Sequence, residues 1–208
     1  MARDYIKDPA EIYRQSFATI EAEAELAHLP APLQPVARRM IHACGMTDLP
    51  ADLAWHGDPV GAAHAALVVA APILCDAQMV AAGIIRDRFH GNEIVCRIGD
   101  PRVPDLARDL GTTRSAAQIE LWRDRLAGAV VVIGNAPTAL YHLIDAIETG
   151  GPRPAAIFAF PVGFVGAKES KEDLIAAGLG VPFLTLRGRR GGSAIAAAAI
   201  NALQDGAE

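Results

Sequence analysis

The stretch AVVVIGNAPTAL, residues 129–140, decides the fold class of this chain. It begins with an uninterrupted apolar run, passes through Gly134 and Asn135, and continues as a helix-forming segment that starts near Pro137. An uninterrupted apolar run is typical of a strand that is buried on both faces, because a strand with one face in water alternates apolar and polar residues. We therefore interpret the stretch as a parallel strand, a loop and a covering helix.

The same succession of strand and helix is predicted over most of the chain. Four more short apolar runs are expected to be strands, namely 72–75, 93–98, 155–160 and 183–188. Helical patterns lie between or after these runs, at about 76–84, 103–126, 137–149, 169–178 and 193–204. Strands that alternate with helices favour a parallel sheet with helices on both faces. We predict an α/β fold, a three-layer α/β/α sandwich with a mainly parallel sheet of about five strands.

The N-terminal segment is predicted to be helical and to pack on this sandwich. Asp8 and Pro9 are typical of a capped helix start, and Glu11 would complete a capping box. A second helix is expected over about 32–44, where a glycine follows and ends it. No linker or change of composition divides the 208 residues, so we expect a single domain over 1–208.

Composition argues against several classes of protein. The formal net charge of −5 disfavours general nucleic-acid binding, which needs a basic face. Cys44, Cys75 and Cys96 have neither zinc nor redox-pair spacing, which favours a reduced, cytoplasmic protein. The N-terminus lacks the apolar core of a signal peptide. The longest apolar run, 62–75, is broken by Pro72 and is too short to cross a bilayer, so no membrane partner is expected.

A ligand site is expected where three strand-to-helix loops meet, because ligands of open parallel sheets bind at the carboxyl ends of the strands. The loops are NAPTAL (135–140), PVGFVGAKES (161–170) and RRGGS (189–193). Their expected helix-start residues are Asn135, Ser170 and Ser193, and their cations are Lys168, Lys171, Arg187, Arg189 and Arg190. Free helix N–H groups and cations would attract a ligand with several carboxylates. One such loop alone would be an ordinary turn, whereas three on one sheet edge favour a shared pocket.

Other site chemistries lack their sequence motifs. No G-x-G-x-x-G follows the first strand of the predicted sheet and no Walker motif occurs, which disfavours a dinucleotide or nucleotide. No histidine pair has the i, i+4 spacing of a helical metal site, and no G-x-S-x-G nucleophile motif is present. We therefore expect neither a metal nor a cofactor.

The stretch RRMIHACG, residues 38–45, places a single histidine in the second helix. At about 100° per residue, the apolar residues of this helix share one face. They are Leu33, Val36, Ala37, Met40, Ile41 and Cys44. His42 lies roughly opposite this core stripe, beside Arg38 and Arg39. We therefore expect His42 outside the core, where it is either exposed to solvent or faces a ligand or a partner subunit.

Six segments spread over the chain resemble the precorrin-8X methylmutase family, also called precorrin isomerases. They are MIHACG (40–45), ILCDAQMVAAGI (73–84), TRSAAQIELW (113–122), IGNAPTAL (133–140), PVGFVGAKESKEDL (161–174) and GRRGGSAIAAAAINAL (188–203). The resemblance runs over essentially the whole chain. The fourth and fifth segments are the most specific, and their order and spacing match the family.

The resemblance implies an isomerase of cobalamin biosynthesis. Members of the family move the C-11 methyl group of precorrin-8X to C-12, which gives hydrogenobyrinic acid. This intramolecular 1,5-sigmatropic shift needs no S-adenosylmethionine, because the methyl group is already on the substrate. The histidine of the matching helix motif is the family's proton donor or acceptor, and here it is His42. Protonation of a ring nitrogen near the migrating methyl group would favour the shift.

The resemblance also implies residues that bind the acetate and propionate arms of the macrocycle. They are Ser16, Arg39, Arg114, Asn135, Thr138, Lys171 and Ser193. It further implies a homodimer with sites near the subunit interface and hand-over of the product to neighbouring pathway enzymes. Ile85 departs from the family pattern, since relatives often carry a small polar residue there. A substrate hydrogen bond at that position is therefore lost or replaced by an apolar contact with the ring.

Two alternatives stay open from the sequence. One is a non-catalytic tetrapyrrole-binding or product-carrier protein on the same scaffold, which would need no titratable group at position 42. The other is the cobalt-precorrin-8 methylmutase of the anaerobic branch. The HACG form of residues 42–45 is more similar to the cobalt-free, aerobic branch.

Overall fold

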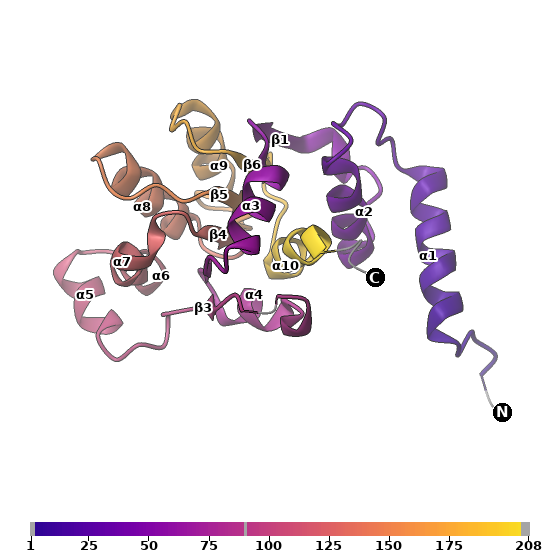
Figure 1. The fold of residues 1–208 in the computed structure, drawn as a ribbon, viewed down its shortest axis with the longest axis horizontal. Coiled ribbons are helices and arrows are strands. Elements are labelled where there is room, and N and C mark those ends of the chain that lie inside the picture. The colour runs from indigo at the N-terminus through magenta and orange to yellow at the C-terminus, as the bar shows by residue number, and fades with distance from the viewer. Residues whose placement is uncertain (1–2, 90, 205–208) are drawn as a thin grey trace.

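The sheet has six strands in the described part of the chain and is parallel except at one edge. A computed structural model describes residues 3–89 and 91–204 (Figure 1). The strands are β1 (Leu53–His56), β2 (Ile73–Cys75), β3 (Ile94–Val95), β4 (Val130–Ile133), β5 (Ala156–Ala159) and β6 (Phe183–Leu186). Their spatial order is β1-β6-β5-β4-β2-β3, and only the β1–β6 pair is antiparallel. The five predicted strands are confirmed as β2 to β6.

The sequence did not predict β1. Only Leu53 of this strand is fully buried, so no continuous apolar run marks the segment. β1 lies at the edge of the sheet and pairs with β6, from Leu53 opposite Leu186 to His56 opposite Phe183. Pairing with a strand much later in the chain, rather than a local pattern, makes these four residues a strand.

Helices cover both faces of the sheet, which confirms the α/β/α sandwich (Figure 1). One face carries α2 (Leu33–Cys44), α3 (Pro59–Val68), α4 (Gln78–Gly83) and α10 (Ser193–Asn201). The other carries the 3-10 segment η3 (Gln118–Trp122), α7 (Arg123–Leu126), α8 (Pro137–Glu148) and α9 (Ala167–Ala176). In β4, Val130 and Val132 pack with the first group, whereas Val131 and Ile133 pack with the second. Both faces of β4 are buried, which explains why all of its residues are apolar.

The predicted helical stretch 103–126 is divided. It contains α5 (Val103–Asp109), α6 (Arg114–Ala117), η3 and α7. Gly111 has a φ of 61°, a backbone conformation that ends α5 and turns the chain. Thr113 then caps α6 by accepting a hydrogen bond from the N–H of Ala116 at 3.2 Å. The helix C-terminal to β6 is likewise shorter than predicted, because α10 gives way to a 3-10 turn, η4 (Ala202–Gln204).

The N-terminal helix α1 (Pro9–Glu23) packs against α2 and lies on the outside of the molecule (Figure 1). Asp8 caps it as predicted, by accepting a hydrogen bond from the N–H of Ala10 at 3.1 Å. The carboxylate of Glu11, predicted to complete a capping box, accepts hydrogen bonds from the side chains of Arg14 and Gln15. α2 ends as predicted at a left-handed glycine, Gly45.

Two further 3-10 turns are short connections, η1 (Leu49–Asp52) before β1 and η2 (Arg86–Arg88) after α4. No helix within residues 3–89 and 91–204 is long and apolar enough to cross a membrane.

The helix start predicted after β5 needs correction, whereas the start predicted at Ser193 after β6 is confirmed. α9 begins at Ala167 after Gly166, so Ser170 lies inside the helix and is buried. α10 begins with Ser193 as its first residue, after Gly192. Both glycines have a positive φ, which a serine or threonine cap would not adopt, and this turn conformation decides where each helix begins.

Candidate active site

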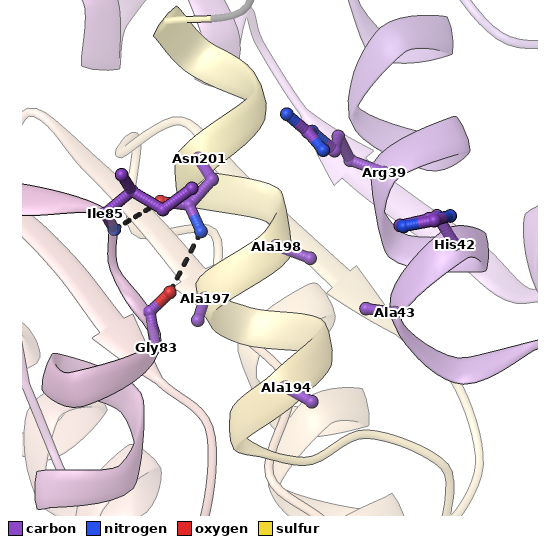
Figure 2. Close-up of a pocket in the computed structure, with 9 residues that line it drawn as sticks. All are labelled: Arg39, His42, Ala43, Gly83, Ile85, Ala194, Ala197, Ala198 and Asn201. Atoms are coloured by element: carbon purple, nitrogen blue, oxygen red, sulfur yellow. Dashed lines mark hydrogen bonds between the residues drawn. The ribbon is translucent and has the colours of Figure 1, made fainter. Parts of the chain in front are cut away.

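A pocket of about 290 Å³ lies along α10, with α2 on one side and the segment of Gly83 and Ile85 on the other (Figure 2). Its lining residues are Arg39, His42 and Ala43 from α2, Ala194, Ala197, Ala198 and Asn201 from α10, and Gly83 and Ile85 from the opposite wall. The volume is slightly below the roughly 300–1,000 Å³ of small-molecule sites, so a large flat ligand would extend beyond it. Of the predicted site residues, Arg39 and His42 line the pocket directly.

His42 lies outside the core, as its position on α2 predicted. Its side chain is exposed, while Met40 and Ile41 beside it are buried. The residues in contact with the imidazole come from α1: the hydroxyl of Ser16 lies 2.8 Å from Nδ1. The rings of Tyr13 and Phe17 lie 5.7 Å and 5.1 Å from the imidazole, centre to centre. His42 is therefore an exposed side chain held in one orientation by a neighbouring helix.

Two arginines of α2 differ in their surroundings. The guanidinium of Arg39 lies over the ring of Tyr13, 5.6 Å from its centre, and borders the pocket. Arg38 forms an ion pair with Glu21 of α1. Arg38 therefore helps to hold α1 on α2, whereas Arg39 brings a positive charge to the side of the pocket where His42 lies.

Glycines and alanines allow α10 to lie close to its neighbours. A Cβ atom at Gly134 would lie 2.7 Å from the Cβ of Ala196, and one at Gly83 would lie 2.7 Å from the Cβ of Ala197. Real Cβ atoms essentially never approach so closely. A side chain at either glycine would push α10 away and move one wall of the pocket.

Asn201 is a pocket residue that the sequence did not predict. Its amide nitrogen donates to the carbonyl of Gly83 at 3.0 Å, and its amide oxygen accepts from the N–H of Ile85 at 2.9 Å (Figure 2). Asn201 therefore holds the wall that carries Ile85, a residue that is 43% exposed. A buried asparagine at the end of an otherwise apolar helix is the signal that could have identified it.

The three predicted loops do meet at one edge of the sheet. The N–H of Gly192 donates to the carbonyl of Phe160 at 2.8 Å, and the N–H of Gly163 donates to the carbonyl of Arg189 at 3.3 Å. A Cβ at Gly134 would lie 3.1 Å from the Cα of Ser193. Ser193 in turn precedes the pocket residue Ala194, so the edge of the three loops continues into the pocket.

The predicted residues Asn135, Thr138 and Arg114 belong to this edge. Asn135 is exposed directly after Gly134. The hydroxyls of Thr138 and Thr113 lie 2.7 Å apart, which brings the start of α6, with the exposed side chain of Arg114, beside α8. Contacts thus link α6, through Thr113 and Thr138, to the start of α8, and link Gly134 to Ser193 beside the pocket; we call these linked residues, with the pocket residues, the row of site residues.

The N–H groups of the loop after β4 are bound within the protein, contrary to expectation. The buried carboxylate of Asp76 accepts hydrogen bonds from the N–H groups of Gly134, Asn135 and Ala136 at 2.8, 3.0 and 2.7 Å. Burial raises the pKa of the Asp76 carboxyl, and the three hydrogen bonds oppose this rise. The Asp76 side chain therefore occupies the donors predicted for a ligand. It follows the β2 run directly, a position that could have identified it.

The cations of the loop after β6 also have partners within the protein. Arg187 pairs with Glu172, and Arg190 pairs with Asp52 and, at 2.8 Å, with Asp48. The side chain of Arg189 lies over the exposed ring of Phe164, 5.6 Å from its centre. Arg187 and Arg190 therefore each have carboxylate partners within the protein, with which a ligand would have to compete.

Lys171 is fully buried, and its ammonium donates to the carbonyl of Arg190 at 2.6 Å. Burial lowers the pKa of Lys171 to about 8. Lys171 therefore supports the loop after β6 from within the protein.

Replacing Lys171 with methionine should change how stability depends on pH. Between about pH 8 and the higher pKa of an unfolded lysine, the unfolded chain holds the proton and the folded protein does not. The free energy of unfolding of the wild type should therefore rise, relative to Lys171→Met, as pH increases through this window. Urea unfolding of both proteins at pH 7 and pH 10 measures the difference. Lys168→Met, an exposed position on the same helix, is the control; equal pH dependence in wild type and Lys171→Met would contradict the prediction.

Within the described residues, no group of three or more His, Cys, Asp or Glu side chains is placed to hold a metal ion. The pocket offers one imidazole, one guanidinium, one amide and apolar walls. This set can exchange a proton, bind a carboxylate and contact a flat apolar ring.

Comparison with known proteins gives consistent results. Residues 11–205 match the family model described as precorrin-8X methylmutase. The chain is 57% identical to the precorrin-8X methylmutase of Pseudomonas aeruginosa, over 96% of this chain and 97% of the relative. It is 37% identical to the cobalt-precorrin-8 methylmutase of Priestia megaterium, over 94% and 87% of the two chains. The crystal structure of precorrin-8X methylmutase from Thermus thermophilus is similar, with a TM-score of 0.85, 38% identity and coverage of 94% and 95%.

Proposed function

This chain belongs to the precorrin-8X methylmutase family of isomerases, and on that basis we propose that it converts precorrin-8X to hydrogenobyrinic acid with His42 as general acid and base. The observation that carries the role of His42 is its position: an exposed imidazole on the wall of the pocket, beside the cation of Arg39. The reaction breaks the bond between C-11 and the methyl group and forms the bond to C-12. Substrate and product are isomers, so a proton that His42 lends to a ring nitrogen must return to it.

The row of residues that leads from the pocket to α6 supports a footprint larger than the pocket itself. We propose that Arg39 binds one carboxylate arm beside His42, and that Ser193, Asn135, Thr138 and Arg114 bind others further along. Charged and hydroxyl donors suit carboxylates, and a macrocycle with several arms needs donors that are spread out. Ser16 and Lys171, the remaining predicted residues, contact His42 and the Arg190 carbonyl respectively. We propose that Lys171 supports the substrate-binding edge through this loop.

The experiment that tests the function is direct conversion. Purified protein is mixed with precorrin-8X, and the formation of the hydrogenobyrinic acid chromophore is followed, with heat-denatured protein as control. Conversion over many turnovers is the expected result. Stoichiometric binding of the tetrapyrrole without conversion would instead support the non-catalytic carrier.

We propose that the physiological substrate is free of cobalt. The higher identity to a relative named for precorrin-8X than to one named for cobalt-precorrin-8 supports this choice. The expected result is a higher kcat/KM for precorrin-8X than for cobalt-precorrin-8, measured side by side. A preference for the cobalt form would assign the protein to the other branch.

We also propose a cytoplasmic homodimer that hands its product to the next enzyme of the pathway. An extended substrate exceeds the pocket of one chain, which supports a second subunit near the site. Exposed apolar side chains, among them Phe164 and Val165 after β5 and Tyr13 on α1, are available for such contacts. Light scattering of the purified protein measures the oligomeric state, and a monomer at micromolar concentration would contradict the dimer.

A further inference from the structure

We infer that Ser16 is a positioning residue for His42: its hydroxyl holds Nδ1 on the α1 side, so that Nε2 faces the pocket and exchanges the proton. The inference rests on the proposed acid and base role of His42. It differs from the role implied by the family resemblance, in which Ser16 binds a substrate arm. The two roles predict different kinetic effects, so experiment can separate them.

The geometry of two helices supports the inference. α2 lies between α10, which also lines the pocket, and α1, which carries Ser16 (Figure 1). Ser16 Oγ lies 2.8 Å from Nδ1 of His42. The two nitrogens occupy different edges of the imidazole, and one of them points towards α10 while the other points away from it (Figure 2). With Nδ1 bound to α1, the nitrogen that faces the pocket is Nε2.

The neighbours of Ser16 on α1 restrict the imidazole further. Tyr13, Ser16 and Phe17 follow the i, i+3, i+4 spacing that places side chains on one helix face. The ring of Phe17 is inclined at 31° to the imidazole, and that of Tyr13 at 58°. Two aromatic contacts and one hydrogen bond therefore fix both the position and the rotation of an otherwise exposed side chain.

A hydroxyl suits a histidine that lends and regains a proton. Serine can donate its hydrogen to Nδ1, and it can also accept a hydrogen bond from Nδ1–H. The Ser16 hydrogen bond can thus persist when His42 is an imidazolium and when it has given its Nε2 proton to the substrate. A carboxylate at the same place would stabilise the imidazolium over the neutral ring. On the pocket side Arg39, a cation, lines the same pocket as His42, and Tyr13 is a titratable neighbour on α1.

Replacing Ser16 with alanine tests the inference. A typical single hydrogen bond corresponds to about a 3- to 10-fold change in rate. We expect Ser16→Ala to lower kcat by about this factor with little change in KM, and Ser16→Thr, which keeps the hydroxyl, to restore it. Thr19→Ala is the matched control, because the Thr19 hydroxyl on the same helix binds the carbonyl of Gln15 and not His42. A raised KM with unchanged kcat would show that Ser16 binds substrate instead, and would overturn the inference.

Two measurements separate failure of the inference from failure of the proposed function. The ¹⁵N spectrum of His42 in the protein without substrate should show a different tautomer balance in Ser16→Ala than in wild type or Thr19→Ala; no difference would overturn the inference. In a double-mutant cycle, Ser16→Ala should have no further effect on rate once His42 is alanine. Equal losses in both backgrounds would show that Ser16 acts independently of His42.

Discussion

His42→Ala should lower kcat for precorrin-8X by about 10²–10⁴-fold, the usual contribution of a positioned general acid or base. In the proposed mechanism a proton on a ring nitrogen speeds the methyl shift, and His42, which lines the pocket, supplies that proton. Substrate binding should change little, because Arg39 and the other proposed arm-binding residues remain. The measurements are kcat from initial rates and Kd from titration of the tetrapyrrole chromophore.

The matched control for this prediction is His64→Ala. His64 is exposed on α3, away from the residues that line the pocket, so its loss should leave both kcat and Kd unchanged. A normal rate for His42→Ala, with the wild type active, would refute the role of His42 but leave the isomerase function intact. A lost rate that accompanies lost binding would assign His42 to substrate binding.

Asp76→Ala should lower the free energy of unfolding by about 3–5 kcal/mol, because it leaves three N–H groups of the loop after β4 without their acceptor. Asp76 is completely buried, so water cannot replace the carboxylate without opening the structure. Typical domains have only about 5–15 kcal/mol of stability in total. Urea unfolding followed by circular dichroism measures the loss.

Asp76→Asn tests the same contacts in a milder form. The amide keeps one oxygen acceptor and should cost less, about 1–3 kcal/mol, so it remains measurable if the alanine variant does not fold. Asp105→Ala removes an exposed carboxylate paired with Arg108, and we expect at most about 1 kcal/mol from it. Stability of Asp76→Ala within about 1 kcal/mol of the wild type would show that the three N–H groups find other acceptors.

Asp76 also holds a turn that belongs to the row of site residues. The turn that it holds places Gly134, the residue before Asn135, next to Ser193 at the start of α10. Asp76 follows the β2 run, whereas its three partners lie 58 to 60 positions later. The sequence shows an acidic residue at position 76, but it does not show which groups that carboxylate binds. The sequence-based expectation that these N–H groups were free for a ligand failed for this reason.

Local patterns were sufficient for the sandwich and for one feature of the site. Continuous apolar runs predicted β2 to β6, because strands buried on both faces cannot tolerate alternating polar residues. Helical periodicity alone put His42 outside the core stripe of α2, and the motifs of the whole chain indicated its family. β1 was not predicted, because it is an edge strand in which only Leu53 is buried and which therefore has no continuous apolar run.

The tertiary structure decided which partners the polar groups bind. Periodicity determines which face a side chain is on, but the residue that meets it depends on how separate segments are packed together. Three hydrogen bonds join segments that are far apart in the chain. They link Ser16 to His42, Lys171 to the Arg190 carbonyl, and Asn201 to the Ile85 N–H. The sequence by itself determined the layers and the exposed histidine; only the packing of α1 on α2 decided how that histidine is held.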